Sequence, residues 1–144
     1  LYRAGRVRAI GVSNFLPHHL ENLLEVCTVP PMVDQIEFHP GYVQWETVEF
    51  CRASQILVEA WSPLGRQRLA DDPLLAELAG KYGVFQAQIC LRFALDCGVV
   101  PLPKSADAGR MRQNLALDFA LEAEDLERLR TMPQTGWSGL HPDK

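Results

Sequence analysis

Short apolar runs alternate along the chain with longer segments in which apolar residues recur at helical spacing. The apolar runs predict four strands, at 7–12, 34–38, 56–60 and 99–103. The helical spacing predicts six helices, at 17–26, 45–54, 73–82, 86–97, 107–116 and 122–132. Strand and helix alternate four times, one further helix follows, and the final residues are predicted to form a loop.

This alternation predicts an α/β fold with a parallel sheet built from βαβ units. The strands are nearly continuous in apolar residues, as is typical of a sheet covered on both faces. Neither G-x-G-x-x-G nor G-x-x-x-x-G-K-[ST] occurs, which disfavours the Rossmann and P-loop folds. Half of a (β/α)8 TIM barrel is the better interpretation. We therefore expect residues 1–144 to be one unit, the carboxyl-terminal half of a longer barrel domain.

Composition narrows the function classes. The chain has 144 residues, 47% of them hydrophobic, and a net charge of −4. This acidic balance argues against binding to nucleic acid or to a membrane surface, and no apolar run approaches the roughly 20 residues that span a bilayer. The four cysteines lie in apolar stretches without a CxxC pair, and no His/Cys cluster has zinc spacing. We expect reduced, buried thiols, a cytoplasmic location and no metal.

Polar residues follow the strands, and the most suggestive group follows the fourth. Lys104 and Ser105 end that strand, and Arg110 lies near the start of the next helix. Two cations, a hydroxyl and a helix N-terminus can together bind a phosphate. A surface lysine, an N-cap serine and a solvated arginine would explain the same pattern equally well.

Side chains at the ends of the first three strands could bind a polar ring substituent. Ser13, Asn14 and Gln35 offer hydrogen-bond donors and acceptors that suit a carboxamide, although backbone capping is an equal alternative. Trp61 ends the third strand, where a core position is twice as common as a stacking platform. The turn that follows it, Ser-Pro-Leu-Gly, favours the rim of a site.

Histidines and carboxylates suggest simpler roles. His39 is predicted to be buried and hydrogen-bonded, and His18 and His19 to be solvated. Glu37 and Glu59 lie within strands and could form the carboxylate pair of a TIM-barrel hydrolase, a minor alternative.

Six motifs in order resemble the carboxyl-terminal half of the aldo-keto reductases. They are GRVRAIGVSNF, QIEFHP, VEAWSPLG, AQICLRFAL, VVPLPKS and DFALEAEDLERL, and they cover nearly the whole chain. Tryptophan in EAWSPLG makes the chain look most like the bacterial branch that includes the 2,5-diketo-D-gluconate reductases.

The resemblance implies a TIM barrel that reduces small-molecule aldehydes and ketones with NADPH, which binds extended across the strand ends. Ser13, Asn14 and Gln35 would hold the nicotinamide carboxamide, and Trp61 would stack on the ring. The remaining roles implied by the family are these: Ser62, Pro63, Leu64 and Gly65 line the pyrophosphate, Lys104, Ser105 and Arg110 bind the 2′-phosphate, Gln113 and Asn114 contact the adenine, and Trp137 lines the substrate pocket.

Two departures from the family pattern change this expectation. Asp107 places a negative charge near the proposed phosphate site, so NADH is retained as an alternative cofactor. The family's catalytic tyrosine, lysine, aspartate and histidine come from the first half of the barrel, and their motifs do not occur here. Tyr2, Tyr42 and Tyr82 do not lie in matching contexts, so we predict no catalytic residue in this chain.

Two further expectations follow. A non-catalytic nucleotide-binding or scaffold protein of barrel fold is the first alternative to a reductase. A half barrel would also leave open strand edges and an apolar inner face, so we expect two copies to associate.

Overall fold

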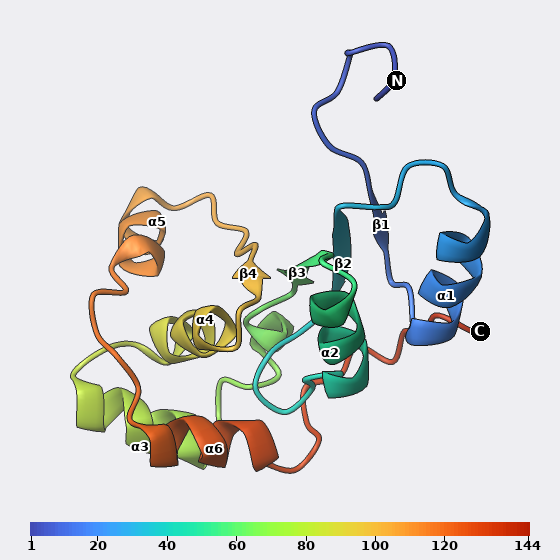
Figure 1. Cartoon of the computed structure of the whole chain (residues 1–144). Helices are drawn as coiled ribbons and strands as arrows, with labels where there is room; N and C mark the ends of the chain where they lie inside the picture. The colour runs from blue at the N-terminus through green and yellow to red at the C-terminus, as the bar shows by residue number, and fades with distance from the viewer.

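The structure, a computed structural model, describes residues 1–144 and contains one parallel sheet (Figure 1). The strands lie in the order β1-β2-β3-β4, so each βα unit adds its strand beside the previous one. All three neighbouring pairs are parallel, which confirms the predicted sheet. The strand bounds are β1 Gly11–Ser13, β2 Val33–Glu37, β3 Leu57–Trp61 and β4 Val100–Pro101.

Six α-helices and one short 3-10 helix connect and cover the strands. Local signals explain where the helices begin and end: Pro73 opens α3 after Asp72, whose side chain accepts a hydrogen bond from Leu75 N, and Gly83 ends it with a positive φ of 65°. No helix is long and apolar enough to cross a membrane. The helices are α1 Pro17–Val26, α2 Trp45–Ala53, η1 Gly65–Gln67, α3 Pro73–Tyr82, α4 Gln86–Asp96, α5 Ala108–Leu115 and α6 Ala123–Thr131.

The core lies between one face of the sheet and the helices. Ile36 of β2 and Val58 of β3 are buried in it, and Phe38 stacks on Phe93 of α4 with ring centroids 5.7 Å apart. Burial alternates along β3: Val58 and Ala60 are buried, whereas Leu57 is 46% exposed. The sheet therefore has a helix-covered face and a more open face, and the prediction that both faces would be covered is wrong for this chain.

Two predicted strands are shorter than expected. The first begins at Gly11 instead of residue 7, and residues 1–9 are exposed and extend away from the body (Figure 1). The parallel register sets Gly11 beside Val33, so the preceding residues face Pro30 and Pro31, which have no N–H to donate. Pro101 and Pro103 limit β4 for the same reason.

Candidate functional site

Hydrogen bonds join the predicted residues across β1, β2 and β3. Ser13 and Trp61 end their strands, but Gln35 lies in the middle of β2 and not at its end, because the parallel register sets Gln35 beside Ser13. The Ser13 hydroxyl donates to the Gln35 backbone oxygen at 2.9 Å. Trp61 Nε1 donates to Asn14 Oδ1 at 2.7 Å, and Gln35 Nε2 donates to Glu59 Oε2 at 2.9 Å. The bonds form two sets, one of Ser13, Gln35 and Glu59 and one of Asn14 and Trp61, and they join residues up to 47 positions apart in sequence.

These partners decide what the two amides offer to a ligand. Asn14 has its oxygen engaged by Trp61, so its NH2 group remains as a donor. Gln35 has its nitrogen engaged by Glu59, so its oxygen remains as an acceptor. A ligand carboxamide needs a donor for its oxygen and an acceptor for its nitrogen. The pair can therefore hold a carboxamide in a single orientation.

Trp61 ends β3, is half-buried and lies outside the hydrophobic core, so the alternative of a core position is wrong. In the turn that follows, Pro63 and Gly65 are buried, whereas Ser62 and Leu64 are half-buried. Gly65 has a φ of 59°, and a Cβ there would come within 2.7 Å of the Leu69 side chain. Glycine is therefore required by both the conformation and the space at this position.

Around the β4–α5 turn, Lys104 and Arg110 are exposed and form no ion pair with a carboxylate. Asp107 is the N-cap of α5 and accepts a hydrogen bond from Arg110 N at 2.7 Å. Ser105 Oγ in turn accepts one from Asp107 N at 3.1 Å. The Asp107 carboxylate thus occupies part of the helix N-terminus that was expected to bind the phosphate. A phosphate would depend mainly on the two cationic side chains.

Two residues on α5 and one in the tail complete the predicted set. Gln113 is exposed, and Asn114 is half-buried beside Ser105 in a hollow of ≈ 440 Å³. Trp137 is half-buried and stacks on Tyr42 with ring centroids 5.8 Å apart. The structure therefore places Trp137 against the segment that follows β2.

The carboxyl-terminal tail is anchored by contacts that no sequence motif indicated. Glu37, 2% exposed, accepts hydrogen bonds from Ser138 N at 3.0 Å and from Ser138 Oγ at 2.6 Å. His39 is fully buried, as predicted, and its Nδ1 donates to the Pro40 carbonyl at 2.8 Å. The partners in the tail lie 101 residues from Glu37, so local patterns could not have indicated this contact.

The tail also reaches α1, where it corrects the prediction for two histidines. His18 and His19 are not simply solvated: Nε2 of each lies within 3.1 Å of Asp143 Oδ1. His19 Nδ1 accepts a hydrogen bond from Leu16 N at 3.0 Å, so its Nε2 carries the proton and donates to Asp143. These three side chains form a group with the spacing of metal ligands, but hydrogen bonds account for it.

Tyr82, Lys81 and Asp125 form a cluster of the residue types that the family uses for proton transfer. The Tyr82 hydroxyl and Lys81 Nζ each donate to Asp125 Oδ2 at 2.6 Å. The hydrogen bond from Lys81 is the main cause of the lowered pKa of Asp125. The pKa of Tyr82 is raised, mainly by burial and secondly by the hydrogen bond to Asp125. A raised pKa makes a tyrosine a poorer proton donor, and the cluster joins α3 to α6 rather than to the strand ends (Figure 1). It is a structural contact between helices.

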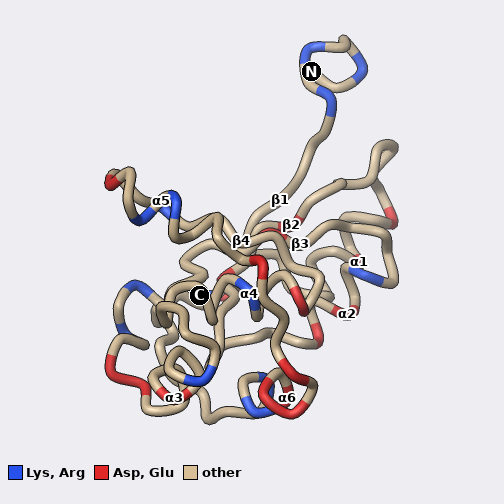
Figure 2. Tube along the Cα trace, turned by 90° about the vertical axis from the view of Figure 1, so that its left-hand side faces the viewer, with Lys and Arg blue, Asp and Glu red and all other residues tan.

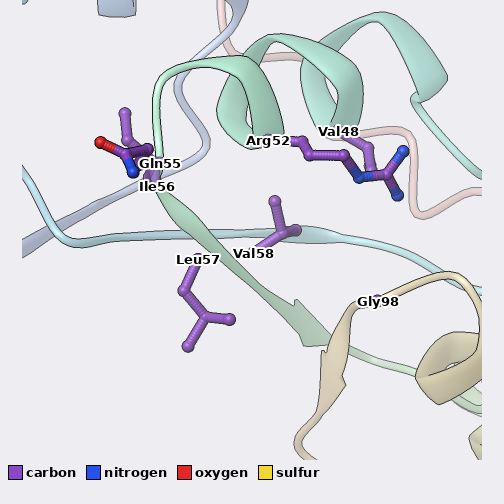
Figure 3. Close-up of a pocket in the computed structure, with 7 residues that line it drawn as sticks. All are labelled: Val48, Arg52, Gln55, Ile56, Leu57, Val58 and Gly98. Atoms are coloured by element: carbon purple, nitrogen blue, oxygen red, sulfur yellow. The ribbon is translucent and has the colours of Figure 1, made fainter.

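One cavity of ≈ 310 Å³ lies away from these residues (Figure 3). Its lining includes Ile56 and Leu57 at the amino end of β3, together with Arg52 and Gly98. Trp61 ends the same strand at the opposite edge of the sheet. The cavity contains none of the predicted cofactor residues and is separate from the candidate site.

Comparison with known proteins agrees with this geometry. Residues 1–132 match the sequence model of the Aldo/keto reductase family. The uncharacterized oxidoreductase YtbE of Bacillus subtilis is 42% identical over 144 residues, which are 99% of this chain and 51% of that protein. Glyoxal reductase of the same organism is 42% identical over 145 residues, 100% of this chain and 52% of that protein.

Solved structures show the same relationship. A variant of Gox0644 in complex with NADPH superposes with a TM-score of 0.94 at 36% identity, covering 100% of this chain and 54% of that one. An aldo-keto reductase of Bombyx mori in complex with NADP gives a TM-score of 0.85 at 35% identity, covering 92% and 47%.

These neighbours are (β/α)8 barrels, and the chain spans about half the length of the curated relatives it matches. The minor alternative of a hydrolase with Glu37 and Glu59 as its carboxylate pair is therefore wrong: Glu37 binds the tail, and Glu59 orients Gln35. The motifs, the parallel sheet and both comparisons agree, and the chain belongs to the aldo/keto reductase family.

Proposed function

We propose that residues 1–144 form the cofactor-binding, carboxyl-terminal half of an NADPH-dependent carbonyl reductase. The observation that carries this proposal is the set of hydrogen bonds that Ser13, Asn14, Gln35 and Trp61 make on the three neighbouring strands. Lys104 and Arg110 follow the next strand, β4, and have no carboxylate partner. Four free cysteines, three of them buried, are consistent with the cytoplasmic location we propose.

The residues present fit such a cofactor, since the polarised amides match a carboxamide and the unpaired cations match a phosphate. When bound, the reduced nicotinamide supplies a hydride. Asn14 and Gln35 would fix the rotation of the ring through its carboxamide, and Trp61 would support one ring face. Lys104, Ser105 and Arg110 would hold the 2′-phosphate, with Gln113 and Asn114 beside the adenine. Orientation of this kind lowers the entropic part of the barrier to transfer.

The substrate we propose is a small aldehyde or ketone. Relatives carry the names glyoxal reductase and methylglyoxal reductase, and both names describe small carbonyl compounds. Trp137, stacked on Tyr42 in the anchored tail, would line the pocket for it. Proton donation to the carbonyl would need residues from outside this chain, since the Tyr82 cluster lies between helices.

A non-catalytic nucleotide-binding protein is the second candidate. The hydrogen-bonded residues on β1, β2 and β3 would serve it equally well, because their proposed role is to hold the cofactor. NADPH binding without turnover of methylglyoxal by the complete protein that contains this chain would support it. Turnover would exclude it.

Replacing Arg110 with alanine is expected to weaken NADPH binding about tenfold or more and to leave NADH binding nearly unchanged, because only NADPH carries the 2′-phosphate. Quenching of Trp61 fluorescence during titration measures both dissociation constants. Arg112→Ala is the matched control: it removes the same charge from the same helix at another exposed position without a carboxylate partner. Equal weakening of both cofactors by Arg110→Ala would contradict the 2′-phosphate assignment.

We further propose that two copies of the isolated chain associate through the β4 edge. Leu115 is 82% exposed and, with Met111, Val100 and Leu95, lines an apolar hollow beside that edge. Leu115→Lys is expected to shift the chain toward monomer in sedimentation velocity, whereas Val26→Lys, at an equally exposed position on α1, should not. A compact monomer at all concentrations of the unaltered chain would refute the association.

A further inference from the structure

Arg66 lies in the turn after β3, directly beside the predicted nicotinamide platform. Its guanidinium carbon is 5.3 Å from the centroid of the Trp61 ring, and its Nε donates to Ser62 Oγ at 2.9 Å. The family motif ends at Gly65, so Arg66 was not among the residues predicted from the sequence. In the structure, the Arg66 side chain folds back over Trp61 and Ser62.

The backbone holds Arg66 in a conformation that L-residues rarely adopt. Its φ is 49°, and Ser62 and Gln67 in the same turn also have positive φ, at 50° and 68°. Such conformations persist only where the surroundings enforce them, and they concentrate at ligand-binding segments. Here the buried Pro63 and Leu69 fix the turn beneath the exposed arginine.

The charge of Arg66 is not balanced by a carboxylate. Arg92 on α4 and Arg128 and Arg130 on α6 are paired with carboxylates, and Figure 2 shows the mixture of red and blue on α6. Arg66 forms no ion pair, and its one polar bond uses Nε, so both terminal nitrogens remain available. An unpaired guanidinium is well suited to two oxygens of a phosphate group.

The covalent order of the cofactor indicates which phosphate lies there. A nicotinamide at Trp61 and a 2′-phosphate at Lys104 and Arg110 set the pyrophosphate between β3 and β4. These strands are neighbours, and Leu102 N donates to the Ala60 carbonyl oxygen at 3.0 Å. The residues predicted to line the pyrophosphate, Ser62 to Gly65, carry no charge, although the group bears two negative charges.

We propose that the Arg66 guanidinium binds the pyrophosphate of the nicotinamide dinucleotide and, in doing so, leaves the Trp61 ring to the nicotinamide. The inference rests on the proposed cofactor function and adds a charged residue to it. Without ligand, the guanidinium covers the indole in a weak cation–π contact. With ligand, the stronger charge-assisted bonds to phosphate replace that contact.

Arg68 offers a matched control within the same turn. It is also exposed and unpaired with any carboxylate, but its Nη1 points to the Gly136 carbonyl oxygen in the tail, at 3.4 Å. Arg66→Gln and Arg68→Gln therefore remove the same charge from nearly the same place. A difference between the two variants isolates the phosphate contact from the general electrostatic field.

Isothermal titration calorimetry of the whole chain with NADPH, NADH and adenosine 2′-monophosphate tests the proposal. Arg66→Gln is expected to weaken NADPH and NADH by the same factor, about 10- to 100-fold, and to leave adenosine 2′-monophosphate unchanged, because that ligand lacks a pyrophosphate. Arg68→Gln should change each dissociation constant less than about threefold. Arg66→Lys should restore part of the loss, which shows that charge rather than folding is responsible.

Several results would overturn the proposal. Unchanged or tighter binding by Arg66→Gln would mean that the guanidinium only covers Trp61. An equal loss in Arg68→Gln would mean that the contact is not specific. If Arg66→Gln weakened the binding of NADPH but not that of NADH, Arg66 would be assigned to the 2′-phosphate. If the unaltered chain binds neither dinucleotide, the proposed cofactor function fails as well, whereas binding that is insensitive to Arg66 leaves that function intact.

Discussion

Replacing Glu37 with alanine is expected to lower the free energy of unfolding by about 3–5 kcal/mol and to release the carboxyl-terminal tail. The carboxylate is 2% exposed and accepts two hydrogen bonds from Ser138, at 3.0 Å and 2.6 Å. Hydrogen bonds to a charged acceptor contribute about 1.5–3 kcal/mol each, and alanine would leave both donors without their partner. Urea unfolding followed by circular dichroism measures the loss.

The position of Trp137 next to Ser138 links this anchor to the proposed pocket. Release of Ser138 should separate Trp137 from Tyr42, the ring on which it stacks. Limited proteolysis should then cleave the tail of the Glu37→Ala variant faster than the tail of the parent chain.

A double-mutant cycle provides the control for the Glu37 prediction. Ser138→Ala removes only the hydroxyl donor and keeps the backbone N–H, so it should cost less than Glu37→Ala. The two changes together should cost clearly less than their sum, because both act on one contact. Additive effects, or a loss below about 1 kcal/mol for Glu37→Ala, would show that this contact does not hold the tail.

The second large effect is expected at Asp34, a buried carboxylate on the helix-covered face of β2. Its side chain is 0% exposed, Oδ1 accepts only a long bond from Phe15 N at 3.4 Å, and Oδ2 has no partner. Burial raises its pKa from 3.8 to about 6. Burial, and secondly the nearby charge of Asp34, raise the pKa of the Cys51 thiol to about 12.

This raised pKa makes stability depend on pH. In the unfolded chain Asp34 loses its proton near pH 4, but in the folded chain only near pH 6. The folded state therefore binds more protons in this range, and the stability that the protonated group contributes is lost as pH rises from about 4 to 6. A shift of this size corresponds to about 3 kcal/mol.

Asp34→Asn removes the titrating group. The difference in unfolding free energy between variant and parent should grow in favour of the variant by about 2.4 kcal/mol from pH 4 to pH 7, since other carboxylates titrate alike in both. Urea titrations at intervals of half a pH unit measure this difference. Asp118→Asn, which makes the same change at an exposed site, is the matched control. If the difference in unfolding free energy did not change with pH, burial would not raise the pKa of Asp34 in the folded chain.

The periodicity of apolar residues was sufficient to predict most elements of the fold. The bounds of α1 and α3 agree with the prediction, because a proline at the first helical position and apolar side chains at helical spacing are local signals. The first and last strands were predicted too long, because pairing depends on what lies opposite. Pro30 and Pro31, distant in sequence, end the ladder of β1.

The same distinction applies to the candidate site. Asn14 and Trp61 could be predicted because each stands at the end of an apolar run within a family motif, and Gln35 because it lies in the motif QIEFHP. Their pairing was not predictable, since it depends on side chains that meet across strands. Arg66 had only a weak signal, a cation directly after the Ser-Pro-Leu-Gly turn, and its direction depends on a left-handed backbone.

By itself, the sequence determined the family, the order of strands and helices, and which residue types stand at the strand ends, because these depend on local spacing along the chain. Only the tertiary structure decided that Glu59 engages the side-chain nitrogen of Gln35 and Trp61 the side-chain oxygen of Asn14, that Asp107 caps the N-terminus of α5, and that Glu37 anchors the tail. The physical reason is that hydrogen bonds and burial depend on distance in space, and folding brings together groups that are up to 101 residues apart in the chain.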